Sequence, residues 1–570
     1  MKFIEFDSDK CDECFKCLRV CPTKAIAFVN NKRHIIDDLC IKCGLCLTHC
    51  EQKALSIHQD IQRVKNAILA GKKVIVSIAP SYAGLFEMKN PSQMATALRL
   101  IGFEYVEETA RGAEIVSKRY EKIIESNKMK NIITSCCPSS NYYIENYFPK
   151  LIDYVIPVVS PMIAHGKYLK DRYGDDAYTV FIGPCVAKKA EAKEIDNAID
   201  AVITFRELEI WFKEREIILK DLESSGFDAP VDKRSKAYPV GGSLWNKDMK
   251  TRVNSNYKYV HINGIEACKE FLKAIENGDI EGYCAEVNIC LGSCLNGPEI
   301  PLTAPNIFKR ISNLNNYVDE KNPENCLLTE VNNHILTDRI FTDKSINKIP
   351  VNEDHVASVL LDMGKYSQRD QINCGACGYS TCYDKAVAVT MGYSDMELCL
   401  DRLKHKVESL QNTIFDNSPN LICILDEELR IQDTNAAFNE IFNKEKTKLK
   451  EWPISTVINT EIFEEINTPL TAKISRKCYI ESVNRTFYVN LIKIHDGVVF
   501  VGIFTDITDA ENNREELMRV KERTIETCQE VINNQMRVAQ EIASLLGETT
   551  AETKLGLNKL KEIVLSEGDY

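Results

Sequence analysis

Residues 11–22 read CDECFKCLRVCP, and residues 40–50 repeat the cysteine spacing as CIKCGLCLTHC. Three thiolates on one tight loop reach three corners of a 4Fe-4S cube, and the fourth ligand comes from the other half of the repeat. Zinc sites are the alternative, but they usually take two cysteines from a loop rather than four. The spacing therefore predicts two cubes, one on Cys11, Cys14, Cys17 and Cys50, and one on Cys40, Cys43, Cys46 and Cys21.

Three further cysteine motifs follow in the middle of the chain, each where a buried strand is expected to end. From about residue 60 to 350 the pattern is α/β, with apolar strands such as KKVIVSIAP (72–80) and helices such as GAEIVSKRYEKIIES (112–126). Because strand ends in an open α/β sheet gather at one edge, the three segments are expected to converge on one metal centre. The motifs are TSCCPSS (134–140), IGPCVAKKAE (182–191) and EVNICLGSCLNGP (286–298).

A third cysteine cluster lies in NCGACGYSTC (373–382) and is completed further along the chain. Its glycines allow backbone amides to approach sulfur. A zinc site is the alternative interpretation. The cluster predicts another 4Fe-4S centre, on Cys374, Cys377, Cys382 and Cys399.

The composition limits the possible classes of protein. A length of 570 residues predicts several domains rather than one core. The 23 cysteines, the absence of a long apolar run and a start unlike a signal peptide predict metal thiolates in a reducing cytoplasm, with no membrane span. A net charge of -12, from 83 acidic and 71 basic residues, argues against nucleic acid as a partner.

The middle motifs, together with the double repeat in front of them, resemble the H-cluster domain of the iron-only (FeFe) hydrogenases over roughly residues 1–300. The resemblance implies a diiron subcluster with CO, cyanide and an azadithiolate, bridged through Cys294 to a 4Fe-4S cube. That cube would be held by the four cysteines Cys137, Cys185, Cys290 and Cys294.

The same resemblance implies roles for three other residues. Lys188 would donate a hydrogen bond to a cyanide, Ser160 would also contact the cofactor, and Cys136 would be the catalytic thiol that passes protons. Taken alone, Lys188 is more often a solvated lysine at a helix start, and Cys136 a small buried hydrophobe. Only the convergence of the motifs favours the functional interpretation.

Several positions depart from the family pattern. The acidic proton relay of the family would fall near Arg119, and Ile156 stands where a relay serine is expected. A permanent cation and an alkyl group cannot shuttle protons at neutral pH, so the usual path is broken and turnover should be slow. Further departures near the cofactor are Gly183, Met162, Asn288, Ser140 and Pro298.

Residues 413–508 resemble a PAS domain, with helix, strand, turn, strand and helix over 414–442 and a closing DIT at 506–508. The lone His495 is interpreted as solvated, with a haem ligand as the alternative. No histidine follows it, so a histidine-kinase phosphoacceptor is absent. The tail from about 510 has apolar residues at helical spacing, which predicts either a helix packed on its own domain or a coiled coil in a homodimer.

These features predict a multidomain chain of α/β and α+β parts. The expected parts are a two-4Fe-4S ferredoxin-like domain (1–58), an H-cluster hydrogenase domain (59–355), a small 4Fe-4S domain (356–404), a PAS domain (405–510) and a C-terminal helical signalling and dimerisation segment (511–570).

The predicted function is that of a sensory FeFe hydrogenase, an enzyme that slowly and reversibly oxidises H2 to protons. Electrons would pass through the 4Fe-4S clusters to signal via the PAS domain, with a kinase or phosphatase downstream. One alternative is a catalytic hydrogenase that exchanges electrons with ferredoxin. The other is a non-enzymatic iron-sulfur redox protein that lacks the diiron unit.

Overall fold

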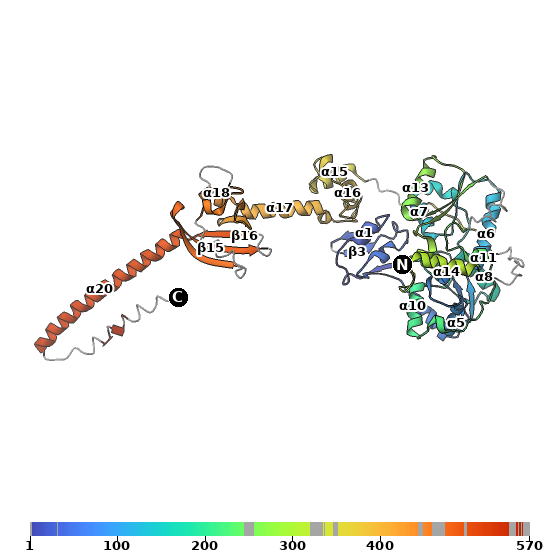
Figure 1. Ribbon diagram of the computed structural model, residues 1–570, viewed down its shortest axis with the longest axis horizontal. Coiled ribbons are helices and arrows are strands. Elements are labelled where there is room, and N and C mark those ends of the chain that lie inside the picture. Colours follow the sequence, from blue (N-terminus) through green and yellow to red (C-terminus); the bar gives the residue numbers. More distant parts are fainter. Residues whose placement is uncertain are drawn as a thin grey trace. The chain divides into compact units, whose positions relative to one another are not determined.

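The structure is a computed structural model of the 570-residue chain. It describes residues 3–30, 32–195, 197–243, 256–319, 335, 337–345, 351–442, 449–458, 473–494, 499–546, 555–556, 558–559 and 561. The chain forms two compact units, residues 1–402 and 403–570, and each is described by itself (Figure 1). His495 lies outside the described residues. None of the described helices is both long and apolar enough to cross a membrane.

The cysteine repeat at the front folds into a small domain with two two-stranded antiparallel sheets. β1 (Ile4–Phe6) pairs with β4 (Leu55–Ile57), and β2 (Ile26–Val29) pairs with β3 (Lys32–Ile35). Each cysteine run leads into a short helix, α1 (Lys16–Val20) or α2 (Leu45–His49). The residue before each helix has a left-handed backbone, with φ 55 at Phe15 and φ 76 at Gly44, which turns the cysteine loop into the helix.

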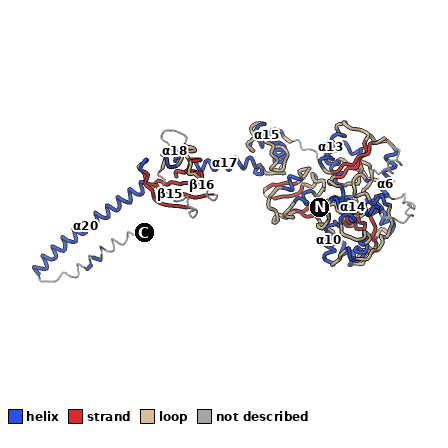
Figure 2. The backbone as a smooth tube through the Cα atoms, in the orientation of Figure 1, coloured by secondary structure: helices blue, strands red, loops and turns tan. Residues whose placement is uncertain are grey.

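The α/β domain contains two parallel sheets rather than the single open sheet expected from the sequence. The strand over 72–80 and the strand before Cys185 lie in the larger sheet, whereas the strands before Cys136 and Cys290 lie in the smaller one. Figure 2 draws the strands in red. The larger sheet has the order β6 (Tyr105–Glu108), β5 (Val74–Ile78), β8 (Tyr178–Gly183) and β9 (Ala201–Thr204). The smaller has the order β10 (Lys258–Asn263), β11 (Tyr283–Asn288) and β7 (Ile132–Ile133).

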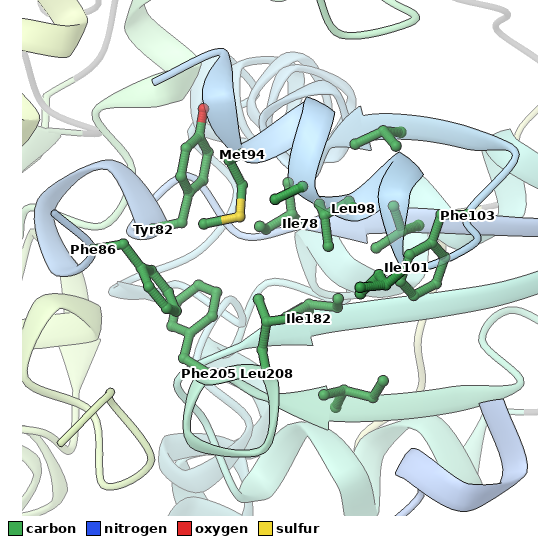
Figure 3. Packing of buried hydrophobic residues seen from close by; sticks show 14 of the residues in the cluster. Ile78, Tyr82, Phe86, Met94, Leu98, Ile101, Phe103, Ile182, Phe205 and Leu208 are labelled. Carbon is green, nitrogen blue, oxygen red and sulfur yellow. The ribbon is translucent and has the colours of Figure 1, made fainter. Parts of the chain in front are cut away.

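Helices cover these sheets and make the main apolar core. Figure 3 shows Met94 and Leu98 against Ile78 of β5, and Phe205 with Leu208 beside Ile182 of β8. Because both faces are covered, the strands are almost entirely apolar. The helices of this domain are α3 (Ile61–Leu69), α4 (Tyr82–Leu85), α5 (Gln93–Leu100), α6 (Ala110–Glu125), α7 (Pro138–Tyr147), α8 (Pro161–Tyr173), α9 (Ala187–Glu194), α10 (Phe205–Glu214), α11 (Lys233–Lys236), α13 (Ile265–Glu276) and α14 (Ile307–Asp319).

Helix α14 falls in the Asn- and Asp-rich stretch that separates the last middle motif from the small cysteine domain. Its Leu314 and Tyr317 are buried in the core around Ile78. This part of the stretch therefore belongs to the α/β domain, because an amphipathic helix with two apolar anchors needs a core to pack on.

The small cysteine domain packs against the front domain. It contains α15 (Glu353–Asp362) and α16 (Cys382–Thr390), and an isolated β-bridge joins Phe28 of β2 to Ser394. Gly378 has φ +92, and a Cβ there would lie 2.8 Å from Cγ of Leu18 on α1. The two cysteine-rich domains therefore meet too closely at this position for any residue but glycine.

The second unit is built on a five-stranded antiparallel sheet. Its strands alternate buried and more exposed residues, as in a sheet with one covered face. The strand order is β13 (Ile431–Thr434), β12 (Leu421–Asp426), β16 (Val499–Asp506), β15 (Arg485–Ile494) and β14 (Lys473–Ile480). The helices are α17 (Leu400–Asp416), which spans the boundary between the units, α18 (Ala436–Phe442) and α20 (Thr508–Leu546).

The long helix α20 does not bury its apolar seam within the described part of the chain. Leu517 is 56% exposed, Val520 55%, Val531 54% and Ile542 51%. Of the two arrangements that the sequence left open, packing on its own domain is therefore not found for this helix.

Candidate active site

A cavity of about 970 Å³, partly continuous with solvent, lies where β8 and β11 end. Cys185 follows β8, Cys290 and Cys294 follow β11, and Cys137 precedes α7. All four line the cavity, so the three motifs do converge, although their strands come from two sheets.

The thiols line the cavity with part of their surface and are otherwise surrounded by protein atoms. Burial raises the pKa of Cys185 to about 11 and that of Cys294 to about 12, and the charge of Lys188 opposes the shift in both. Cys294 exposes its side chain into the cavity. A cationic neighbour lowers the cost of forming thiolates, which a metal cluster requires as ligands.

A buried carboxylate fixes Lys188 at the cavity wall. The Nζ of Lys188 donates to Oε2 of Glu191 at 2.8 Å, and the Ser160 hydroxyl donates to the same oxygen at 2.7 Å. Arg339 donates to the other oxygen of Glu191 at 2.8 Å. The Ser160 side chain thus bonds to Glu191, while the next two residues, Pro161 and Met162, line the cavity.

Cys136 lies in the same cavity, beside Cys137. Burial raises the pKa of the Cys136 thiol well above its usual value, and the nearby charge of Glu286 raises it further. Burial likewise raises the pKa of Glu286 to about 7. The Cys136 thiol is therefore protonated at neutral pH.

Two observations test whether the implied cofactor fits this cavity. Ser81 is fully buried and lines the cavity, and its Oγ has no hydrogen-bond partner among the described residues. A buried hydroxyl without a partner is costly, and a bound group with acceptor atoms would satisfy it. With four thiols, one ammonium group and this hydroxyl, the wall fits an iron-sulfur group with anionic ligands.

The departure at Gly183 has a steric reason. A Cβ at this position would lie 2.7 Å from ring atoms of Phe181 and 3.3 Å from Cβ of Ala79. Phe181 lines the cavity. Its ring therefore occupies the space next to Gly183 that a larger side chain would need.

Neither of the two expected relay positions carries a side chain that can relay a proton. Arg119 is partly exposed on α6 and forms an ion pair with Asp338 at 3.0 Å. Ile156 is fully buried among apolar side chains. Neither side chain offers a group that gains and loses a proton near neutral pH.

The front domain brings its eight cysteines together in the two predicted sets. Cys11, Cys14, Cys17 and Cys50 line one cavity of about 500 Å³. Burial raises the pKa of Cys17 to about 11, with the neighbouring Cys11, Cys50 and Cys14 adding to the shift. Burial also raises the pKa of Cys46, and the neighbours that add to this shift include the rest of the second set, Cys43, Cys21 and Cys40.

The cysteine sites are adjacent to one another. Cys43, from the second set, lines the central cavity together with Cys290. Cys17, from the first set, is close enough to Cys46 for its charge to raise the pKa of Cys46. Burial and the other three thiols of the second set raise that pKa more. The second set therefore lies next to the central cavity.

The small domain also gathers its predicted cysteines. A cavity of about 320 Å³ is lined by the four, and Tyr379 lies at the same cavity. Burial raises the pKa of Tyr379, and charges on Cys377 and Cys21 add to the shift, so this domain faces the second set of the front domain. In the described part of the chain, no three His, Cys, Asp or Glu side chains meet closely enough to hold a single ion. The four cavity-lining thiols are those of Cys374, Cys377, Cys382 and Cys399.

Comparisons with family models match most parts of the chain. The model of the iron only hydrogenase large subunit, C-terminal domain, matches residues 72–244 and 243–298. A 4Fe-4S dicluster domain matches 3–51, an Fe-S cluster model matches 370–400, and a PAS domain matches 409–476.

Known proteins are similar to parts of the chain. Iron hydrogenase 1 from Clostridium pasteurianum is 30% identical over 383 residues, which cover 54% of this chain and 67% of that one. A cytosolic Fe-S cluster assembly factor NAR1 from Yarrowia lipolytica is 26% identical over 201 residues, 32% of this chain and 40% of that one. The structure of a variant of FeFe-hydrogenase HydA1 from Chlamydomonas reinhardtii has a TM-score of 0.41 at 18% identity, covering 51% and 100% of the two chains.

The fold and the cysteine sites define an iron-sulfur protein of the hydrogenase class with a ferredoxin-like domain and a PAS domain. The chain belongs to the iron-only (FeFe) hydrogenase family.

Some residues in or beside the cavity wall were not predicted from the sequence. Glu191 lies three residues after Lys188 on α9, a spacing that places the two side chains on one helix face and offered a signal. Ala79, Pro80 and Ser81 follow β5 directly, at the same end of the sheet as Cys185. Their strand-end position was the available signal, but the segment carries no cysteine to mark it.

Proposed function

We propose that this protein is a sensory FeFe hydrogenase that oxidises H2 slowly and reversibly and signals through its PAS domain. The observation that carries the proposal is the central cavity, where four thiols, the Lys188 ammonium and the protonated Cys136 thiol meet. H2 is apolar and small, so a buried cavity of this kind suits it as a substrate.

The residues divide into those that hold the cofactor and those that handle protons. When bound, the H-cluster supplies the iron site at which H2 is split into two protons and two electrons. Its cube would be held by Cys137, Cys185, Cys290 and Cys294, and a cyanide ligand would accept from Lys188, which Glu191 keeps in place. The protonated Cys136 would donate and accept protons at the cavity wall.

The adjacency of the cysteine sites supports an electron route toward the PAS half. Cys43 would collect electrons at the central cavity, and Cys21 would pass them to the small domain beside Cys377. Cys399 would close that cluster, and α17 begins at the next residue, Leu400. A change in the last cluster would therefore act at the start of the helix that enters the PAS unit.

The exposed seam of α20 supports a homodimer. Leu517, Val520 and Val531 recur at helical spacing and would be buried in a parallel coiled coil with a second copy. We propose that the dimer presents the signal to a downstream kinase or phosphatase in the cytoplasm, because the chain itself has no histidine after His495.

Two alternative functions would give different results in the same experiments. In a catalytic hydrogenase linked to ferredoxin, the PAS domain would only dock partners, and turnover would be high. The similarity to an Fe-S cluster assembly factor favours a second alternative, an iron-sulfur protein without a diiron unit. In that case the protein would carry its cubes but would not respond to H2.

Electron paramagnetic resonance of the matured protein tests the proposed route. Under H2 we expect the signal of a reduced cluster that disappears in Cys399→Ser, while the front-domain signals remain. Cys478→Ser, which changes a cysteine outside all four sites, is the control. If hydrogen reduces the same set of clusters in Cys399→Ser as in the native protein, the small domain is not on the route.

A further inference from the structure

A hydrogen-bonded chain of polar side chains is buried against the larger sheet. The proposed function does not use these residues. The chain links β5, β6 and α8, and none of its members is a cysteine or one of the residues proposed to hold the cofactor. His165 and Glu107 have no exposed side-chain surface, and Ser77 is fully buried as well. The members in order are Thr109, Ser77, His165, Glu107 and Tyr173.

Each neighbouring pair in this chain is in hydrogen-bond contact. The hydroxyls of Thr109 and Ser77 are 2.7 Å apart, and Ser77 Oγ lies 2.8 Å from Nδ1 of His165. Nε2 of His165 lies 3.3 Å from Oε2 of Glu107, the longest link. The hydroxyl of Tyr173 donates to Oε1 of Glu107 at 2.7 Å.

The charges around Glu107 set the direction of these bonds. Burial raises the pKa of Glu107, but the bonds from His165 and Tyr173 and the charge of Arg172 outweigh it and lower the pKa below its usual value. An ionised carboxylate only accepts, so the N–H at Nε2 of His165 donates to Glu107. In a neutral ring the other nitrogen, Nδ1, is then an acceptor for the Ser77 hydroxyl. Ser77 and His165 therefore each accept on one side and donate on the other, whereas the bonds from His165 and Tyr173 both end on Glu107.

The two ends of the chain open onto different places. Thr109 lines the central cavity, together with Cys136 and Ser81. At the other end Tyr173 is partly exposed, and the neighbouring Arg172 side chain, which donates to Glu107 at 3.0 Å, is 39% exposed. The chain thus runs from the cavity to the protein surface.

A purely structural network is the simplest alternative, because buried polar groups need partners. The Ser77, His165 and Glu107 order also occurs in hydrolases, but Ser77 and His165 are both without exposed surface here and have no room for a substrate. Neither alternative explains why the network ends at the cavity wall. The two positions of the family relay, Arg119 and Ile156, meanwhile leave the cavity without its usual proton route.

We propose that Thr109, Ser77, His165, Glu107 and Tyr173 form a proton relay between the central cavity and the surface. The proposal rests on the proposed hydrogen chemistry, because only a reaction that makes or consumes protons in the cavity needs it. A proton from the cavity enters at Thr109, and the hydrogen bonds pass one proton on from each group to the next as far as Glu107. The Tyr173 hydroxyl then turns toward solvent, releases its proton there and takes the proton of Glu107. The hydroxyls turn back before the second proton of each H2 follows, and the two electrons leave through the cysteine sites.

The relay is tested by an isosteric pair of variants at Thr109 in the matured protein. Thr109→Val removes the hydroxyl and keeps the shape, whereas Thr109→Ser keeps the hydroxyl. The side chain of Thr109 makes no capping bond to α6, so its loss does not weaken that helix end. Thr179→Val is the control, because it removes a buried hydroxyl from β8, the strand next to β5, outside the relay.

Two readouts are compared: the exchange of D2 with water, and the rate at which the CO and cyanide infrared bands shift after a jump in pH. In Thr109→Val both rates should fall on the order of a hundredfold, with band positions and intensities unchanged. Thr109→Ser should restore most of both rates, and Thr179→Val should match the native protein. Ser77→Ala, which breaks the next link, should repeat the loss.

The relay is wrong if Thr109→Val and Ser77→Ala, both with intact bands, keep native rates in the two readouts. A loss that Thr109→Ser does not restore would also contradict it, since the hydroxyl would then not be the cause. Native protein without CO and cyanide bands would instead overturn the proposed function, on which the relay depends.

Discussion

Cys43 and Cys290 line the same cavity, although one belongs to the ferredoxin-like domain and the other to the α/β domain. They are close enough for the charge of Cys43 to raise the pKa of Cys290, after burial and the other thiols at the site. Because electron transfer falls off with distance, this pair would be the exit for electrons from the cavity in the proposed function. The predictions concern the residues on both sides of this pair.

Cys294→Ala should remove the diiron unit and leave the front clusters. In the proposed site Cys294 is the bridging ligand, so its loss should abolish the CO and cyanide infrared bands. Iron analysis should fall from about eighteen irons per chain, the content of four cubes and one diiron unit. Unchanged bands in this variant would show that another residue bridges the two parts.

Cys136→Ala and Cys137→Ala should differ in kind. Cys136 is assigned no ligand role and its thiol is protonated, so its loss should keep iron and infrared bands but slow proton-coupled steps. Cys137→Ala should disrupt the cube and lower the iron content. Iron loss in Cys136→Ala but not in Cys137→Ala would reverse the assignment within this pair.

Installing Glu at position 119 and Ser at position 156 should raise hydrogen turnover, because groups able to carry protons would replace an arginine and an alkyl chain. Ile156→Ser should also lower the free energy of unfolding by about 2–5 kcal/mol, since Ile156 is fully buried in an apolar core. The turnover assay is paired with a melting curve for this reason.

Two controls separate the relay effect from the loss of an ion pair. Arg119 pairs with Asp338, so Arg119→Ala and Asp338→Asn each break the pair without adding a relay group. Both should leave turnover unchanged. High turnover in the native protein would support the catalytic alternative instead.

Removing the chain after residue 405 should leave hydrogen chemistry intact and abolish signalling. Residues 1–402 form one compact unit and include every predicted cluster cysteine up to Cys399. The truncated protein should keep the native infrared spectrum and its change under H2, while the response of the downstream partner is lost. Loss of the hydrogen response in the truncated protein would show that the PAS half supports the active site.

The cysteine sites were predictable because cluster ligands obey strict spacing. The two sets in the front domain and the four thiols of the small domain were expected from the sequence, and each set is gathered in the structure. The convergence of three distant motifs was expected as well, although the division of their strands between two sheets was not.

Contacts between elements distant in the sequence could not be predicted in the same way. The fit of Gly378 against Leu18 depends on how two domains pack, and no local pattern encodes it. The relay contact between Ser77 and His165 joins residues 88 positions apart whose side chains are ordinary in their own segments. The packing of Leu314 and Tyr317 of helix α14 on the core around Ile78 is likewise a contact that the Asn-rich sequence of the helix does not encode.

Infrared spectroscopy of the anaerobically matured protein, under H2 and under argon, tests the central claim most directly. CO and cyanide absorb where protein does not, so their bands report the diiron unit alone. The proposed function predicts bands under argon that shift reversibly under H2, while turnover remains low. A fully matured protein that shows no CO and cyanide bands, or whose bands are the same under both gases, would contradict it.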